Sequence, residues 1–463
     1  MVSFSSTDII IIVTFFAVMV LIGFLPSIRK DDTAESYLLS GRKVGLFLFI
    51  LTNVSTWYGG ILGVGEFTYK FGLLSWFTQG LPYYIFAIVF AFFLAPKIRN
   101  ASLFTIPDML EARYGHLIGL LSSVLIFILV SPAPYILMVG SLLQLIFKTD
   151  LLTSIIIAAL FSSIYLIKGG YKSDLYTDVF QFFIMFAGFI IIVIVSFKDV
   201  GDLNFLANNL PPDHLSLTGG ASSFYILVWF LIALWTFADP GFHQRCYAAK
   251  DSSTAKWGII ISVLLWAVFD FLTTTTGLFS RALIPGLENP VMAFPLYAEK
   301  ILSSGLKGIF YAALFATILS TSNSFLFLSA TTFGRDLVFK QLKNREKADL
   351  ILFTRIGILI SAIVAILLAY TVQSVINLWF VVGSFCIPGI ILLIFGAYYE
   401  KFKVGYKYAI SEIIAAPLLS VIWYFIIDKI ENQYLQLVEP MIAGLIAALI
   451  IHLAGLIKKE RLN

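Results

Sequence analysis

The sequence is poor in charge and has almost no cysteine. Of its 463 residues only 13% are Asp, Glu, Lys or Arg, whereas a soluble domain typically has about 25%. The two cysteines, Cys246 and Cys386, lack the spacing of a disulfide framework. The four histidines are scattered, so they form no metal-ligand pattern. These shortages argue against a soluble domain, a disulfide scaffold and a zinc site.

Motifs of enzymes are also missing. The chain has no glycine-rich phosphate loop, no GxSxG nucleophile elbow and no Cys/His metal spacing, so an enzyme is not expected. The longest predicted connections, around 198–221 and 285–305, are too short for a soluble domain. Residues 1–8 contain no Lys or Arg, which indicates that the first apolar segment is a retained helix and not a cleaved signal peptide.

Long apolar segments fill most of the chain. Hydrophobic residues make up 59% of the composition, and they fall into runs of about 20, the length of a helix that crosses a bilayer. The runs are continuously apolar and do not alternate, which favours helices over a barrel. The sequence therefore predicts an all-α integral membrane protein in a lipid bilayer. Its about 13 transmembrane helices are expected near 8–28, 44–69, 73–95, 117–147, 150–168, 174–197, 222–244, 257–284, 306–334, 350–371, 375–399, 406–427 and 436–457.

Lys and Arg are distributed unequally between the predicted loops. With the N-terminus placed outside, 24 of the 31 basic residues fall on the cytoplasmic side, an excess that is typical of cytoplasmic loops. The sequence thus predicts a multi-pass protein of the plasma or inner membrane, with its N-terminus outside and its C-terminus cytoplasmic. The net charge of +4 reflects this topology and not a nucleic-acid partner. The seven basic residues outside are Lys70, Lys148, Lys198, Arg281, Lys300, Lys307 and Lys429.

Two of the predicted helices are interrupted. The second contains "TNVSTWYGG" (52–60), and the seventh contains "FADPGF" (237–242), where Pro240 removes a backbone donor. Glycine and proline are common in membrane helices, but here the two breaks stand five helices apart, so each opens a block of five helices and the blocks have inverted topology. Matched interruptions of this kind indicate a transporter's binding site. The predicted parts are a first helix and cytoplasmic loop at 1–43, five-helix repeats at 44–197 and 198–399, and two C-terminal helices at 400–463.

The segment "LFATILSTSNSF" (314–325) concentrates polar side chains inside an apolar run. On a helix, Thr317, Ser320, Thr321 and Ser324 follow the spacing i, i+3, i+4, i+7 and share one face. Hydroxyl residues let membrane helices approach closely and bond across their interface. The same oxygens, joined by carbonyls freed at a broken neighbouring helix, suit a hard monovalent cation. Composition alone leaves both interpretations open.

Five motifs of the chain occur together in one protein family, in the same order and at the same spacing, between about residues 30 and 400. They are "ESYLLSGRKVG" (35–45), "FTIPDMLEARYG" (104–115), "GGYKSDLYTDVFQ" (169–181), "ADPGFHQRCYAAKD" (238–251) and "ATILSTSNSFLFLSATTFGRD" (316–336). The chain therefore resembles the sodium:solute symporter family, whose members have thirteen helices with a leucine-transporter-like inverted five-helix repeat. The resemblance implies a sodium-coupled transporter.

The resemblance also implies the ligands of a sodium ion. Hydroxyls would come from Ser320 and Thr321, with a backbone carbonyl from Thr317 on the same helix. Carbonyls at Leu51 and Val54 would complete the site from the break in the second helix. Only backbone oxygen is required of Leu51, Val54 and Thr317, so their side chains raise no objection.

Asp178, in "YTDVFQ", marks a second place for an ion. In some members of the family the matching acid forms a second ion site with hydroxyls one turn beyond the main pair; Ser324 matches one of these, whereas Asn323 replaces another. An intramembrane carboxylate is also costly in its own right, by about 2.5 kcal/mol or more at the bilayer centre, and so marks an ion path. The simpler alternative is an ion pair with Lys168 or Lys172 near the interface.

The substrate is expected at the midplane, between the broken helices and their neighbours. Sugar carriers of the family use Gln where this chain has Tyr58 and Phe380, which disfavours a sugar. No Arg is expected deep within a helix to bind a carboxylate, but free amides at a break can do so. The candidate substrate residues are Asn53, Ser55, Thr56 and Tyr58 at the first break, Gln79 on the third helix, Trp235 and Phe237 on the seventh, and Phe380 and Ser384 on the eleventh.

Two further acids lie within predicted helices. Asp270, in "WAVFDFLTTTTG", is expected either to bond the Thr273–Thr276 run as a protonated acid or to couple transport to protons. Asp239, which precedes Pro240, is expected to cap the amides freed at the seventh-helix break, with substrate contact as the alternative.

Together these patterns predict a sodium-coupled symporter that imports a small polar or amphiphilic solute by alternating access. An amino acid or organic acid is preferred over a sugar, and the expected partners are the solute, sodium and the lipid bilayer; nothing indicates an obligate protein partner. The alternatives are a proton-coupled transporter on the same scaffold, an ion channel and a substrate sensor. The paired breaks favour alternating access over a channel.

Overall fold

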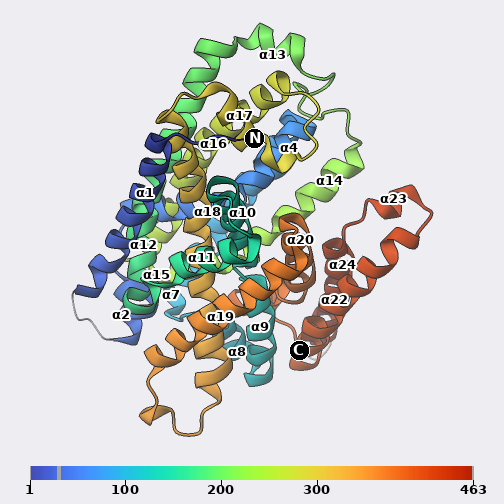
Figure 1. Cartoon of the computed structure of the whole chain (residues 1–463). Coiled ribbons are helices and arrows are strands. Elements are labelled where there is room, and N and C mark those ends of the chain that lie inside the picture. Colours follow the sequence, from blue (N-terminus) through green and yellow to red (C-terminus); the bar gives the residue numbers. More distant parts are fainter. Residues whose placement is uncertain (1, 29–32, 461–463) are drawn as a thin grey trace.

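Helices provide the regular structure in the computed structural model, which describes residues 2–28 and 33–460. Within these ranges a few side chains are not described, namely those of Lys347, Ile376, Asn377, Phe380, Asp428, Gln433 and Glu460. Val44 and Ala249 form an isolated bridge, and no strand occurs in the described ranges. Figure 1 shows the helices gathered around α18 (Leu306–Thr331), with α22 (Tyr406–Ile426) and α24 (Pro440–Glu460) packed together at one side.

The predicted membrane helices are present. Among the described residues, eleven helices are long and apolar enough to cross a bilayer, and a bent pair, Leu46–Tyr58 with Ile61–Phe71, supplies a twelfth crossing. The shorter apolar helix α11 (Leu151–Ser163) lies at the remaining predicted segment. The all-helical membrane fold is confirmed. The eleven spans are Ser6–Ser27, Leu73–Phe93, His116–Phe147, Leu166–Val200, Ser223–Ala248, Ser252–Leu283, Leu306–Gln341, Leu350–Val372, Val381–Tyr398, Tyr406–Ile426 and Pro440–Lys459.

Helix α18, which carries the polar run, is the centre of the molecule. It packs against α12 (Leu166–Val195), α1 (Ser6–Phe24) and α19 (Leu350–Val372), and almost all of its side chains are buried. A helix that is surrounded by protein faces no lipid. Its hydroxyl and amide groups are therefore shielded from lipid, which makes so polar a segment tolerable within a membrane.

A glycine allows the closest of these helix contacts. Gly188 of α12 lies against α18, where an added Cβ would sit 2.3 Å from the Cβ of Ala313. We expect Gly188→Val to push the two helices apart and to lower the thermal unfolding midpoint clearly, because overpacking a close contact costs about 1–3 kcal/mol. Gly45→Ser is the matched control, since a Cβ at Gly45 meets no atom within 4 Å. Equal midpoints for the two variants in detergent would contradict this packing.

The second membrane helix is broken as predicted. Its first half, α3 (Leu46–Ser55), ends in a 3₁₀ turn at Thr56–Tyr58, and α4 (Ile61–Phe71) continues after a bend of 58°. Two glycines at the bend let other helices approach. A Cβ on Gly59 would lie 2.4 Å from the side chain of Thr321, and one on Gly60 would collide with the ring of Trp379.

The seventh helix is also interrupted. Helix α14 (Ser223–Ile232) passes into a 3₁₀ stretch at Ala233–Ala238, and α15 (Pro240–Ala248) begins after an extended residue, Asp239. The carboxylate of Asp239 accepts a hydrogen bond from the backbone N–H of Phe242 at 2.8 Å. This confirms its predicted role as a helix cap. The eleventh helix has an unpredicted break, a 3₁₀ turn at Ile387–Gly389.

Ion pairs join two of the sequence motifs at one end of α18. Asp108 of α8 (Ile106–Tyr114) lies 2.8 Å from Arg335, and it also pairs with Lys340. Burial would raise the pKa of Asp108, but these two cations outweigh it and hold that pKa below its usual range. The pairs anchor the end of α18, and thereby the helix that carries the polar run.

Candidate functional site

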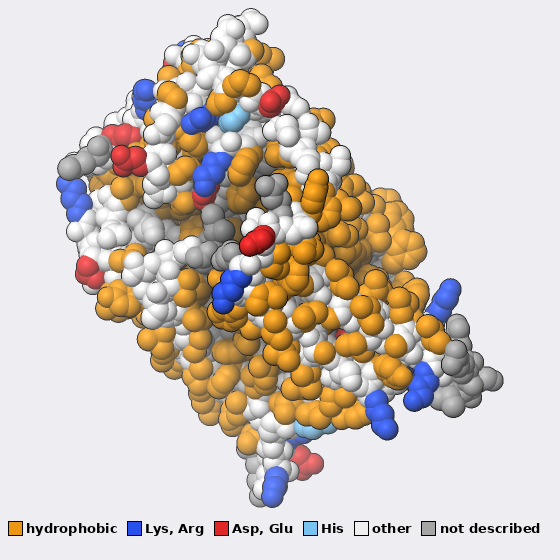
Figure 2. Space-filling view, turned by 90° about the vertical axis from the view of Figure 1, so that its right-hand side faces the viewer, with side chains coloured by type: hydrophobic (Ala, Val, Ile, Leu, Met, Phe, Trp, Pro, Cys, Tyr) orange, Lys and Arg blue, Asp and Glu red, His pale blue; other side chains and the backbone are white. Residues whose placement is uncertain are grey.

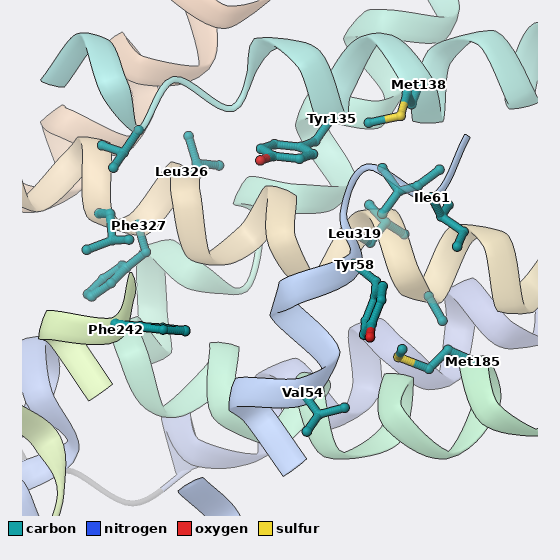
Figure 3. Packing of buried hydrophobic residues seen from close by; sticks show 14 of the residues in the cluster. Val54, Tyr58, Ile61, Tyr135, Met138, Met185, Phe242, Leu319, Leu326 and Phe327 are labelled. Atoms are coloured by element: carbon teal, nitrogen blue, oxygen red, sulfur yellow. The ribbon is translucent and has the colours of Figure 1, made fainter. Parts of the chain in front are cut away.

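The break in the second helix lies directly against the polar run of α18. The hydroxyl of Thr321 donates a hydrogen bond of 2.6 Å to the backbone carbonyl of Thr56. Figure 3 shows Val54 and Tyr58 on the broken segment beside the α18 ribbon that carries Leu319. The two elements that were predicted to share an ion are therefore in contact, and both are buried.

The four hydroxyls on this face of α18 have different environments. Thr317 and Thr321 donate to backbone carbonyls, Thr317 to Ala313 of its own helix at 2.7 Å. Ser324 donates to a carboxylate oxygen of Asp174 at 2.6 Å. The hydroxyl of Ser320 is fully buried and has no hydrogen-bond partner in the described part of the chain. A buried polar atom is normally satisfied, so the Ser320 oxygen is the one that fits a cation ligand.

Helix α3 ends at the break, so its last backbone carbonyls lose their regular helical partners. The last four carbonyls of any helix lack a regular intrahelical partner. Because α3 ends at Ser55, Val54 is among these four, whereas Leu51 lies one residue before them and is still within the regular part of the helix. The N–H of Thr56 caps α3 by turning to the carbonyls of Thr52 and Val54. Leu51 and Val54 are both buried. Neutral hydroxyl and carbonyl oxygens of this kind fit a monovalent ion such as sodium.

A buried arginine lies beside this contact. The guanidinium of Arg245, on α15, donates to the hydroxyl of Thr56 at 2.5 Å and to that of Ser324 at 3.3 Å. It also donates to the carbonyl of Thr52 at 3.3 Å and pairs with Asp178 at 3.5 Å. Arg245 is only 2% exposed. The expectation that no Arg lies deep within a helix is wrong, because α15 restarts at Pro240 and carries Arg245 into the protein interior.

Asp174 is a site residue that the sequence analysis missed. It is fully buried on α12, one helical turn before Asp178, and it accepts the hydrogen bond from Ser324. The i, i+4 spacing of the two acids was the available signal, since it places both carboxylates on one helix face. Asp174, Asp178 and Arg245 thus form a buried charged group next to the broken helix.

The sequence around this site matches a known family. The sequence model of the sodium:solute symporter family fits residues 37–405, a range that includes both broken helices, α18 and all residues of the buried charged group. The chain belongs to the sodium:solute symporter family. It is accordingly a multi-pass membrane transporter, and sodium is its coupling ion.

Curated relatives carry symporter names, and solved structures share the fold. A sodium/proline symporter of Staphylococcus aureus (strain JH9) is 25% identical over 478 residues, which cover 96% of this chain and 91% of the relative. The structure of a Na⁺-coupled sialic acid symporter superposes with a TM-score of 0.83 at 18% identity and covers 98% of each chain. A nucleobase-cation-symport-1 family transporter gives a TM-score of 0.58 at 15% identity, covering 93% of this chain and 95% of that one.

Two of the three residues expected at the second ion site, Asp178 and Ser324, lie next to the same arginine. Asp178 and Ser324 both contact the guanidinium of Arg245. Asn323 is fully buried, and neither atom of its amide has a hydrogen-bond partner among the described residues. Asp178 pairs with Arg245, which lies on another membrane helix. The alternative predicted from the sequence, an ion pair with Lys168 or Lys172 near the interface, did not include this arginine.

The substrate candidates fall into two groups. At the first break, Ser55 and Thr56 donate to the carbonyl of Thr52, and Tyr58 donates to that of Trp266 at 2.8 Å. Asn53 and Gln79 each keep a buried amide nitrogen without a partner in the described part of the chain. These two amides remain the better candidates for a substrate contact.

The two aromatic candidates on the seventh helix pack against neighbouring helices. The ring of Trp235 packs against α20 (Val375–Cys386), so closely that a Cβ added at Gly383 would overlap it. Phe237 contacts the rings of Phe86 and Phe395 at 5.6 and 5.0 Å. Ser384 is buried, and the side chain of Phe380 lies outside the described residues.

The carboxyl group of Asp270 contacts a tyrosine and, among the described residues, has no hydrogen bond to the threonine run. The hydroxyl of Tyr84 donates to its carboxylate, and the indole N–H of Trp76 donates to Tyr84 at 3.3 Å. The hydroxyl of Thr273 instead donates to the backbone carbonyl of Asp270, and that of Thr276 donates to the backbone carbonyl of Leu272. The predicted bonding of the Asp270 carboxyl group to that run is therefore wrong.

Proposed function

We propose that this symporter imports a small polar or amphiphilic solute, with an amino acid or organic acid as the preferred class. Sodium binds between the second-helix break and α18, through the hydroxyls of Ser320 and Thr321 and the carbonyls of Leu51, Val54 and Thr317. The solute binds beside the break, near Asn53 and Gln79. Sodium and solute then leave together when the opposite side opens, with the N-terminus outside and the C-terminus cytoplasmic.

One observation carries the sodium site. Thr321 contacts the carbonyl of Thr56 across the two elements, and the neighbouring hydroxyl of Ser320 is buried without a partner. Simple helix packing would satisfy both hydroxyls locally, as it does for Thr317. A buried hydroxyl with unused lone pairs, close to the end of a broken helix, suits an oxygen ligand of a cation.

Three features support an amino or organic acid. The Staphylococcus aureus relatives are named sodium/proline symporters. Tyr58 and Phe380 stand where family sugar carriers use Gln. The guanidinium of Arg245 is held by Thr56, Ser324 and Asp178, so a substrate carboxylate would bind to backbone amides at a break and to the side-chain amides of Asn53 and Gln79.

A ligand screen tests the proposal. We expect proline or another small amino or organic acid to raise the thermal unfolding midpoint of the purified protein in sodium buffer, and to do so far less in potassium buffer. The reason is linkage: if sodium raises solute affinity by a factor, solute raises sodium affinity by the same factor. The measurement is a thermal-shift series with amino acids, organic acids and sugars, followed by uptake into proteoliposomes.

Two outcomes would contradict the proposal. Equal stabilisation by the solute in sodium and in potassium buffer would show that solute binding is not coupled to sodium binding. Uptake driven by a proton gradient without sodium would favour proton coupling, for which Asp178 and Asp270 are the candidate carboxyl groups.

A further inference from the structure

A cavity of about 600 Å³ lies at one end of the last two membrane helices, far in sequence from the transport site. It is formed where α22 begins, where α24 ends and along the connection that precedes α22. A Cβ added at Gly405 would meet no atom within 4 Å, so the space above this residue is open. The volume is within the range of about 300–1,000 Å³ that is usual for small-molecule sites.

Lysines dominate the lining of this cavity. Lys403, Lys407, Lys458 and Lys459 all line it, with Glu400 as the one acid of the lining. Glu400 is already balanced, because it pairs with Arg113 and lies 3.5 Å from Lys459. The ammonium groups of Lys403, Lys407 and Lys458 have no hydrogen-bond partner among the described residues. The cavity therefore has an excess of positive charge, which suits an anion.

The charged cavity continues into a lipid-facing surface. Exposed aliphatic and aromatic side chains recur every three or four residues along α22 and α24, which places them on one face of each helix. Figure 2 shows this side of the molecule as a broad hydrophobic area with Lys and Arg side chains gathered at its edge. The exposed residues are Ile414, Leu418, Ile422 and Phe425 on α22, and Ile446, Ile450, Leu453 and Ile457 on α24.

Tyrosines mark the boundary between the two surfaces. Tyr406 and Tyr408 line the cavity, and Tyr406 is 49% exposed. Tyrosine is enriched at the level of lipid head groups, where its ring contacts acyl chains and its hydroxyl contacts water. A phospholipid placed here would lay its chains on the apolar face and its phosphate among the lysines.

We propose that this cavity binds the phosphate-bearing head group of an anionic phospholipid, with Lys403, Lys407 and Lys458 as the residues that recognise it. Basic pockets between membrane helices bind acidic head groups because lysine charges meet the phosphate at the edge of the hydrocarbon core. A soluble anion would gain nothing from the adjoining apolar face. This site is independent of the proposed sodium and solute sites.

Lipid binding is measured directly with the purified full chain in neutral detergent. We expect phosphatidylglycerol to raise its thermal unfolding midpoint by about 3 °C or more, and phosphatidylcholine to have little effect. The K403Q/K407Q/K458Q variant should lose this shift. Gly405→Phe, which fills the cavity and keeps the lysines, should lose it too. Both variants must first show the unfolding midpoint of the unaltered protein when no lipid is added.

The matched control is K43Q/K250Q/K343Q, which removes three exposed lysines outside the cavity. It should keep the full shift. If the control loses the shift as well, the effect is general charge attraction and the proposal fails. It also fails if inorganic phosphate alone gives the same shift, since the occupant is then a soluble ion, or if phosphatidylglycerol gives none. Because the readout is lipid binding, failure here leaves sodium-coupled transport untouched.

Discussion

Replacing Ser320 and Thr321 together with alanine is expected to lower the apparent sodium affinity of solute uptake at least tenfold. Each substitution removes a hydroxyl from the proposed ion site. A hydrogen-bonding group that faces a charge contributes about 1.5–3 kcal/mol, and about 1.4 kcal/mol corresponds to a factor of ten in affinity. Because binding is linked, solute affinity at fixed sodium should fall too. The measurement is initial uptake into proteoliposomes as a function of sodium concentration.

Single substitutions separate ion binding from helix packing. Ser320→Ala breaks no hydrogen bond of the described residues, since the Ser320 hydroxyl has no partner, so a loss of sodium affinity in this variant reflects a lost ligand. Thr321→Ala also removes the bond to Thr56. Thr317→Ala is the control, because only the backbone carbonyl of Thr317 is proposed to bind sodium, and its sodium affinity should stay within about twofold. An unchanged sodium affinity in a folded variant that carries both Ser320→Ala and Thr321→Ala would contradict the proposed sodium site.

Local chemistry explains why the two breaks were predictable. Pro240 cannot donate to the preceding turn and Asp239 caps the helix that follows, so the seventh-helix break follows from neighbouring residues alone. Gly59 and Gly60 likewise mark the second break, although their physical reason is tertiary: Thr321 and Trp379 occupy the space where a Cβ would stand. Helical spacing was enough to place Thr317, Ser320, Thr321 and Ser324 on one face.

Other parts of the site depend on contacts that no local pattern contains. Arg245 is linked to Thr52 and Thr56, about 190 residues away in the chain. In the sequence, Arg245 lies near the end of an apolar segment and resembles an ordinary cytoplasmic cation. In the structure, the extended residue Asp239 redirects the chain before α15, and Arg245 points into the protein. The partners of Asp270 were unpredictable for the same reason. The five sodium ligands and the substrate residues stay predictions.

The second large effect is expected at Arg245. Arg245→Ala removes the cation next to Asp178 and Asp174 and leaves two buried carboxylates beside the broken helix. Removing one partner of a buried pair typically costs about 3–5 kcal/mol, because the remaining charge is uncompensated. We expect a large fall in the thermal unfolding midpoint and a loss of transport. Lys250→Ala, at an exposed cation just beyond α15, is the control and should change neither.

A second substitution shows whether uncompensated charge causes the loss of stability in Arg245→Ala. In the Arg245→Ala background, Asp178→Asn removes one uncompensated charge and should recover part of the lost stability, whereas we expect Asp178→Asn alone to destabilise the protein. Interaction energies of about 0.5–3 kcal/mol are usual for such neighbours. Asp174→Asn in the same background shows which carboxylate the guanidinium balances. If neither double variant is more stable than Arg245→Ala, the arginine acts through its hydrogen bonds to Thr52, Thr56 and Ser324, and its role is to hold α15, α3 and α18 together.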